Sequence, residues 1–164
     1  MASYDKSDTV RLEVATPRDA TKLLKFISAY YRFDRIPLDR KALALALSLL
    51  LENQALGRAF FIRTRGRVVG YMILTFGFDL EFGGRQATVT DFYINSGHRR
   101  KGVGREALMQ VETFCRECSV KAIELQVTGK NARALIFYKS CGFEAYDRIP
   151  MSKRLDLFPC GSEP

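Results

Sequence analysis

The spacing of apolar and charged residues in the first third of the chain predicts one strand followed by two helices. Residues 10–14 alternate apolar with charged side chains, which is the two-residue period of a half-buried strand. Thr16 and Pro17 suit a helix start, because threonine can cap a helix and proline is tolerated at its first position. Residues 41–53 are almost continuously apolar. We therefore expect a second helix there that is deeply packed or forms part of a subunit contact.

The middle of the chain has the pattern of extended structure. Two apolar runs, residues 60–62 and 68–74, flank a turn at Arg65-Gly66 and so predict an antiparallel hairpin. A Gly-Gly pair at residues 83–84 marks another turn. A further strand, residues 87–94, is predicted to follow it.

The second half returns to a helical period. From Val103 onward, apolar residues recur on one face at a spacing of about 3.6 residues, which is typical of an amphipathic helix. A strand over 122–127 and a short helix over 131–140 follow, and the stretch up to residue 157 has room for one or two final strands. Strands interspersed with helices in this way predict a mixed α/β sheet.

The chain has the length and composition of one globular domain. We find no repeat, low-complexity stretch or linker, and so predict a single domain over residues 1–164, with a polar tail over 1–9 and a loose tail over 158–164. The longest apolar run, residues 42–51, is too short to span a bilayer. The polar N-terminus does not resemble a signal peptide, so we expect a cytoplasmic protein.

Charge and cysteine content narrow the range of partners. Lys and Arg number 26 against 18 Asp and Glu, a net charge of +8, which favours an anionic partner such as nucleic acid, an acidic membrane surface or a phosphate-rich cofactor. Neither a basic stripe nor an aromatic RNA-reading motif is evident. Cys115 and Cys118 fit the buried face of a helix better than a redox or zinc site. With His98 as the single histidine, we predict no metal site.

The most informative stretch joins the strand that ends at Ile94 to the helix that begins near Val103. Its residues 99–104 are Arg-Arg-Lys-Gly-Val-Gly. A glycine-rich loop that opens a helix presents free backbone N–H groups at the positive end of the helix dipole. Arginines add charge-assisted contacts to phosphate oxygens. The loop is therefore predicted to hold a diphosphate.

Three segments taken together resemble the GNAT superfamily of acetyl-CoA-dependent N-acetyltransferases. They are Thr-Asp-Phe-Tyr-Ile at 90–94, the Arg-x-x-Gly-x-Gly loop at 99–104, and Asn-Ala-Arg-Ala-Leu-Ile-Phe-Tyr at 131–138 followed by Cys-Gly-Phe. The resemblance runs from about residue 12 to residue 157, with diamine acetyltransferases among the nearer relatives. It implies an α/β (α+β) fold: a mixed, mostly antiparallel sheet of six to seven strands, with two splayed central parallel strands and about four helices.

The resemblance also implies a cofactor site. Acetyl-CoA would bind as co-substrate, with the pantetheine arm lying along the end of the 87–94 strand and the pyrophosphate on loop amides, while Asn131 contacts the cofactor from the other side. The implied cofactor-binding residues are Phe92, Tyr93, Ile94, Arg99, Arg100, Lys101, Gly102, Val103, Gly104, Arg105 and Asn131.

The family's chemistry is direct attack of an amine on the thioester. The resemblance implies that Tyr138 protonates the departing thiolate, a role open to a positioned phenol. Some relatives carry Glu as the base at the position of Thr90, so the base must lie elsewhere. Asp91 is our candidate, although alternation points it to the opposite face unless a bulge re-aims it. Asp79, Glu81, Glu124 and a bare water chain remain alternatives.

Two segments contain aromatic and acidic residues suited to a cationic amine. We expect Tyr30 and Tyr31 from one, and Asp79 and Glu81 from the other, to bind the acceptor. The predicted function is acetyl transfer from acetyl-CoA to a primary amine of a small molecule or peptide. The alternatives are a catalytically silent CoA-binding module and a basic nucleic-acid-binding domain. We expect no membrane partner and consider a homodimer compatible with the apolar second helix.

Overall fold

The computed structural model describes residues 9–34, 36–153 and 155 of the chain. These residues divide into two compact units, Met1–Thr128 and Gly129–Pro164, which are described in turn. Within the described part, no helix combines the length and the apolar character needed to cross a bilayer.

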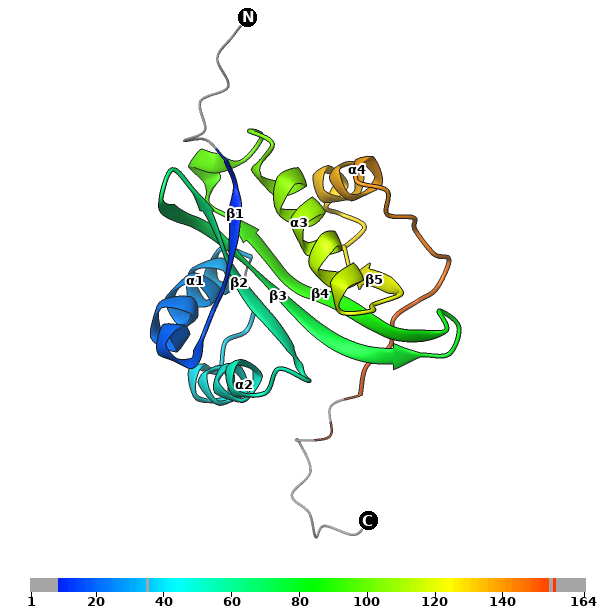
Figure 1. Cartoon of the computed structure of the whole chain (residues 1–164), viewed down its shortest axis with the longest axis horizontal. Coiled ribbons are helices and arrows are strands. Elements are labelled where there is room, and N and C mark those ends of the chain that lie inside the picture. The colour runs from blue at the N-terminus through cyan, green and yellow to red at the C-terminus, as the bar shows by residue number, and fades with distance from the viewer. Residues whose placement is uncertain (1–8, 35, 154, 156–164) are drawn as a thin grey trace, which may run out of the picture. The chain divides into compact units, whose positions relative to one another are not determined.

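The first unit is built on a five-stranded sheet in the order β1-β2-β3-β4-β5 (Figure 1). The first four strands pair antiparallel, whereas β4 and β5 are parallel. The sheet is therefore mixed, as the sequence predicted. Its strands are β1 (Arg11–Val14), β2 (Gly57–Thr64), β3 (Arg67–Asp79), β4 (Gly84–Ile94) and β5 (Ala122–Leu125).

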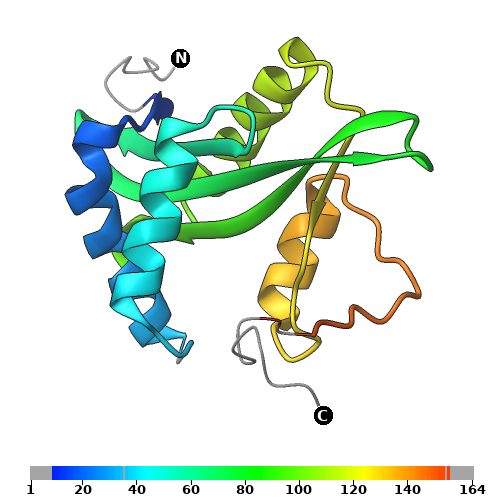
Figure 2. The same ribbon diagram turned by 90° about the horizontal axis from the view of Figure 1, so that it is seen from below.

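Three helices of the first unit cover the two faces of this sheet. Helices α1 and α2 lie on one face and α3 lies on the other (Figures 1 and 2). Two short 3-10 turns, Pro17–Asp19 and Ser96–His98, precede α1 and the loop before α3. The helices of the whole chain are α1 (Ala20–Phe33), α2 (Arg40–Glu52), α3 (Val103–Glu117) and, in the second unit, α4 (Ala132–Ser140).

Alternation along the strands produces a separate core on each face. Phe61 and Tyr71 are fully buried and pack with Leu23 and Ile27 of α1. Phe60, the neighbour of Phe61, faces the other way and meets Phe114 of α3 with ring centroids 5.2 Å apart. Each fully buried side chain of this size stabilises the fold by about 1.5–3 kcal/mol relative to its exposed state, so the two cores fix which side of each strand faces which helix.

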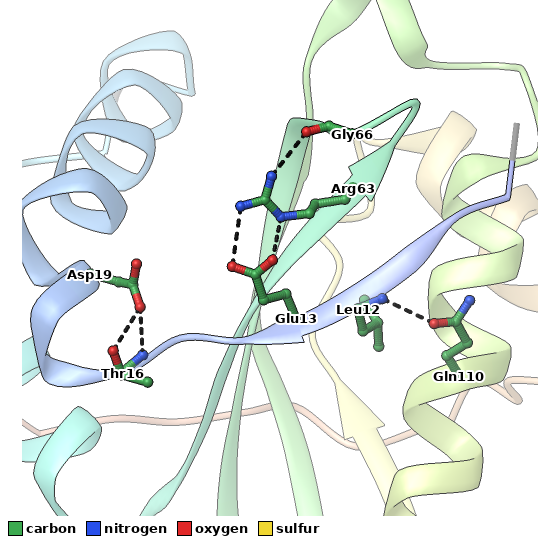
Figure 3. A network of polar contacts seen from close by, with 7 residues as sticks. All are labelled: Leu12, Glu13, Thr16, Asp19, Arg63, Gly66 and Gln110. Carbon is green, nitrogen blue, oxygen red and sulfur yellow. Dashed lines mark hydrogen bonds and ion pairs between the residues drawn. The ribbon is translucent and has the colours of Figure 1, made fainter. Parts of the chain in front are cut away.

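Polar contacts hold the edge strand β1 in place (Figure 3). The Gln110 side chain of α3 accepts a hydrogen bond from the Leu12 amide at 3.0 Å and donates one to the Val10 carbonyl at 2.8 Å. Glu13 forms an ion pair with Arg63, whose guanidinium also donates to the Gly66 carbonyl at 3.0 Å. An unpaired strand edge is a template for aggregation, and these contacts occupy part of it.

The second unit contains α4. Asn131 caps this helix, its side chain accepting a hydrogen bond from the Ala134 amide at 3.1 Å. Tyr138 packs against Phe137 and Phe143 with centroid distances of 5.2 Å and 5.6 Å. The aromatic residues of the motif thus form a small cluster within their own unit.

The sequence overestimated the number of strands. The described residues form five strands, not six or seven, because the segment after α4 contains no strand up to Lys153. Beyond Phe143 its apolar residues are solvent-exposed, 87% for Ile149 and 94% for Met151, and offer no buried face for a sheet. The predicted hairpin and the four helices are confirmed. The loose tail over 158–164 lies outside the described residues.

Candidate active site

A β-bulge in β4 decides where Asp91 points. Val89 pairs with Leu74 and Asp91 pairs with Ile73, so Thr90 is an extra residue on β4. Ile73 belongs to the core beneath α1 and α2, and Leu74 faces the other way. Asp91 therefore shares the face of Ile73, although Val89 two residues earlier is on the opposite face. The sequence allowed for a bulge that would change the face on which Asp91 lies, and the structure contains such a bulge.

The same bulge coincides with the end of the pairing between the two parallel strands. Pairs between β4 and β5 run from Gln86 with Ala122 to Val89 with Leu125, and none is found beyond this point in the described chain. Strand β4 continues past this point through Phe92, Tyr93 and Ile94. Backbone N–H and C=O groups that leave a ladder need other partners. One is found at the strand's end, where the Arg99 Nε donates to the Ile94 carbonyl at 2.6 Å.

Residues 99–104, which we call the anion loop after the site that the sequence predicts there, have an unusual backbone. Arg100 and Gly102 are both in the left-handed region, with φ of 61° and 80°. Gly102 is the N-cap of α3, and no side-chain hydrogen bond caps the helix there. A Cβ built on Gly102 would meet nothing within 4 Å, so the space above it is open. The first amides of α3 are thus available to a diphosphate, with Arg100, Lys101 and Arg105 exposed around them.

Asp91 is a half-buried carboxyl in an aromatic environment. Burial raises its pKa from 3.8 to about 7, and a hydrogen bond from the Tyr31 hydroxyl opposes part of that rise. A carboxyl group with a pKa near neutrality can serve as a general base at physiological pH. The structure thus brings together Asp91 and Tyr31, two residues that the sequence assigned to different roles.

Four tyrosines pack in the core on the same face of the sheet as this carboxyl. Tyr30 packs against Tyr31 and Tyr93 with centroid distances of 5.8 Å and 5.4 Å, and Tyr71 lies 6.1 Å from Tyr93. We call Tyr30, Tyr31, Tyr71 and Tyr93 the tyrosine cluster. The Arg99 guanidinium stands 5.3 Å over the Tyr93 ring and connects the cluster to the anion loop. Burial raises the pKa of Tyr30 and of Tyr31 to about 12, so both hydroxyls remain protonated at neutral pH.

Sequence reasoning missed Tyr71. The run Val-Val-Gly-Tyr-Met-Ile-Leu looked like uniform core, and the phenol was counted among its apolar residues. The available signal was the hydroxyl itself, because a buried tyrosine usually has a hydrogen-bond partner. Tyr71 is fully buried, yet its hydroxyl has no partner among the described residues.

Several predicted site residues lie elsewhere. Asp79 ends β3 at the hairpin turn, where its carboxylate accepts a hydrogen bond from the Glu81 amide at 2.7 Å. Asp79 lies six residues along β3 from Ile73, the partner of Asp91, which corresponds to about 20 Å of strand. This turn is therefore remote from Asp91. Glu124 lies on β5 opposite Thr88. Asn131 and Tyr138 belong to the second unit, and their proposed contacts with acetyl-CoA stay predictions.

Comparison with known proteins identifies the class. The model of the Acetyltransferase (GNAT) family matches residues 21–143, well over half of the chain. The match includes the bulged strand, the anion loop and α4. This chain belongs to the GNAT family and is an acetyltransferase.

Solved structures share the fold. An integron cassette protein from the mobile metagenome of Cole Harbour Salt Marsh is 30% identical, with a TM-score of 0.77 over 88% of this chain and 90% of that one. An aminoglycoside acetyltransferase from an uncultured soil metagenomic sample is 17% identical, with a TM-score of 0.71 over 88% of this chain and 95% of that one. The second likeness concerns the fold alone.

A curated relative adds a substrate name. Streptothricin acetyltransferase of Streptomyces lavendulae is 36% identical over 59 residues, which are 36% of this chain and 31% of that protein. The chain thus matches less than a third of the relative's length. The substrates in these names are antibiotics and not diamines, so the expected closeness to diamine acetyltransferases is not supported.

Proposed function

We propose that this acetyltransferase moves the acetyl group of acetyl-CoA to a primary amine of a small molecule, with Asp91 as the general base. The observation that carries the proposal is the bulge at Thr90, which turns Asp91 toward Tyr31 at the point where β4 leaves β5. One irregularity thus brings a carboxyl with a pKa near neutrality beside the strand segment that the family resemblance assigns to the cofactor, which supports its role as the base.

The anion loop fits the cofactor. Its left-handed backbone at Arg100 and Gly102, its uncapped helix and its open space suit the pyrophosphate of acetyl-CoA. When bound, acetyl-CoA supplies an activated acetyl thioester. Arg99, at the start of the loop, donates a hydrogen bond back to the Ile94 carbonyl and so ties the loop to the end of β4. Residues 92–94 offer their backbone to the pantetheine arm.

The acceptor binds as a cation and must be deprotonated before it reacts. Aromatic faces attract an ammonium group, and the Asp91 carboxylate pairs with it. Asp91 is about half ionised near pH 7, so it can take the proton from the ammonium and pass it to solvent. The names of the similar proteins favour an aminated antibiotic, such as a streptothricin or an aminoglycoside, as the small molecule.

The test is CoA release measured with a panel of streptothricin, aminoglycosides, polyamines and amino acids. We expect turnover with at least one aminated antibiotic and a loss of about 100-fold or more in kcat/KM for Asp91→Asn. Asp79→Asn removes the same charge at the remote hairpin turn and is the matched control. Acetyl-CoA binding without turnover of any amine would instead support the silent CoA-binding module, and unchanged kinetics for Asp91→Asn would remove Asp91 from the mechanism.

A further inference from the structure

The hydroxyl group of Tyr71 occupies a position that packing alone does not explain. Its side chain is 0% exposed, its oxygen is fully enclosed, and no described residue hydrogen-bonds it. A buried polar group without a partner destabilises a fold relative to an apolar group of the same shape. Phenylalanine has the same ring without the hydroxyl, and the neighbouring core positions Phe26 and Phe61 already hold phenylalanine. The hydroxyl therefore destabilises the fold, and no hydrogen bond among the described residues compensates for this.

The register of the sheet places Tyr71 next to the proposed base. Tyr71 pairs with Tyr93 across the two strands, and Asp91 pairs with Ile73, two residues along β3. Tyr71 and Asp91 are thus diagonal neighbours on one face, a separation that long side chains bridge. The electrostatic influence of Asp91 on the Tyr71 hydroxyl agrees with this placement.

The other groups that face Asp91 leave room for one more donor. Helix α1 contributes Tyr30 and Tyr31, and β4 contributes Tyr93 with Arg99 over its ring. Tyr31 donates to Asp91, whereas the Tyr30 hydroxyl donates to Asp34 at 3.4 Å. An ionised carboxylate accepts about four hydrogen bonds, and its terminal torsion is soft enough to turn toward a second donor.

We propose that the Tyr71 hydroxyl donates a second hydrogen bond to Asp91 once that carboxyl has lost its proton. Tyr71 is then a positioning residue that acts through the base, and this inference rests on the function proposed above. The proton balance is simple: the Asp91 carboxylate takes one proton from the acceptor ammonium and releases it to solvent. Tyr71 keeps its own proton throughout, because burial raises the pKa of its hydroxyl far above neutrality.

The experiment is a titration of the Asp91 carboxyl carbon by NMR in the full chain, without substrate. We expect Tyr71→Phe to shift this titration upward by about 1 pH unit, because the ionised form loses a donor. Tyr31→Phe, which removes the donor already in place, should shift it in the same direction. Ser28→Ala is the control for the loss of a buried hydroxyl, because the Ser28 oxygen is also enclosed and has no hydrogen-bond partner among the described residues.

Kinetics give a second measurement. If the base titrates near pH 8 in place of pH 7, the ionised fraction at pH 6.5 falls from about one quarter to about one thirtieth. We therefore expect Tyr71→Phe to lose about eightfold in kcat/KM at pH 6.5 and to recover by pH 9, while Ser28→Ala behaves like the unsubstituted chain. In the unsubstituted chain, the Tyr71 hydroxyl proton should move downfield as Asp91 ionises, which tests the contact without any variant.

The outcomes separate this inference from the proposed function. A Tyr71→Phe titration and pH profile that coincide with those of the unsubstituted chain would overturn the inference, and the hydroxyl would then be a packing defect like that of Ser28. A shifted Asp91 titration in a protein that acetylates no amine would support the contact and overturn the proposed function. A shift in Ser28→Ala equal to that in Tyr71→Phe would also overturn the inference, because the effect would then be unspecific.

Discussion

Replacing Asp91 with asparagine should stabilise the protein while it removes the base. The change keeps the size of the side chain and its capacity to accept the Tyr31 hydrogen bond, but it removes a charge that burial disfavours. The pKa of Asp91 rises from 3.8 to about 7 on folding, roughly 3 units, and each unit corresponds to about 1.4 kcal/mol. The expected gain is therefore about 4 kcal/mol once Asp91 is fully ionised.

The sign of the pH dependence follows from proton binding. Below pH 3.8 the carboxyl is protonated in both the folded and the unfolded chain, so it adds no pH-dependent difference. Between pH 3.8 and about 7 the unfolded chain has lost the proton and the folded chain has kept it. The stability contributed by protonated Asp91 is therefore lost as pH rises through this window. Above about pH 7, Asp91 causes no further loss of stability.

Urea unfolding at pH values from 4 to 8 measures the effect. The difference in unfolding free energy between Asp91→Asn and the unsubstituted chain should grow by about 1.4 kcal/mol per pH unit within the window and then level off. Asp79→Asn corrects for the removal of one negative charge from a chain of net charge +8. A difference that stays constant from pH 4 to pH 8 would refute the reasoning, since Asp91 would then ionise alike in both states.

Three further changes probe other parts of the molecule. Gly102→Asp places a carboxylate on a left-handed N-cap with φ of 80°, and isothermal titration should show acetyl-CoA affinity reduced at least tenfold. Tyr138→Phe should lower kcat with little change in acetyl-CoA affinity; an unchanged kcat removes the acid role. Leu45 and Leu49 on α2 are 65% and 53% exposed, and they lie between Lys41 and Glu52. In an antiparallel pair of copies, Lys41 of one copy would face the oppositely charged Glu52 of the other. If such a dimer forms, Leu45→Lys should yield monomers in light scattering.

The sequence correctly predicted the parts of the fold that depend on local patterns of residues. The apolar period after Val103 and the turn at Arg65-Gly66 predicted α3 and the β2–β3 hairpin, because each signal lies within the element itself. The glycine-rich turn before α3 was predicted in the same way, since it is a local feature, while its binding of a diphosphate stays a prediction. The extra strands predicted after α4 are absent from the described residues, because whether a segment joins a sheet depends on a distant partner edge.

The arrangement around Asp91 was beyond a local pattern for the same reason. A bulge is an extra residue in one strand relative to its partner strand. The sequence of residues 87–94 alone does not determine with which β3 residue each of them pairs. Alternation alone placed Asp91 on the face opposite to that of Thr90. Tyr71 was hidden in a different way, since its ring obeys the apolar pattern and only the enclosed hydroxyl is unusual.

Deleting Thr90 would separate the two effects of the bulge. Val89 faces Leu74 and Asp91 faces Ile73, so removal of the extra residue leaves a regular register in which Asp91 keeps its face. The bend that coincides with the end of β4–β5 pairing would disappear, and pairing could continue past Val89 and Leu125. We therefore expect the Asp91 carboxyl to keep its raised pKa while acetyl-CoA binding weakens strongly, measured by NMR titration and calorimetry. Undiminished acetyl-CoA affinity in this variant would show that cofactor binding depends neither on the bulge nor on the end of β4–β5 pairing.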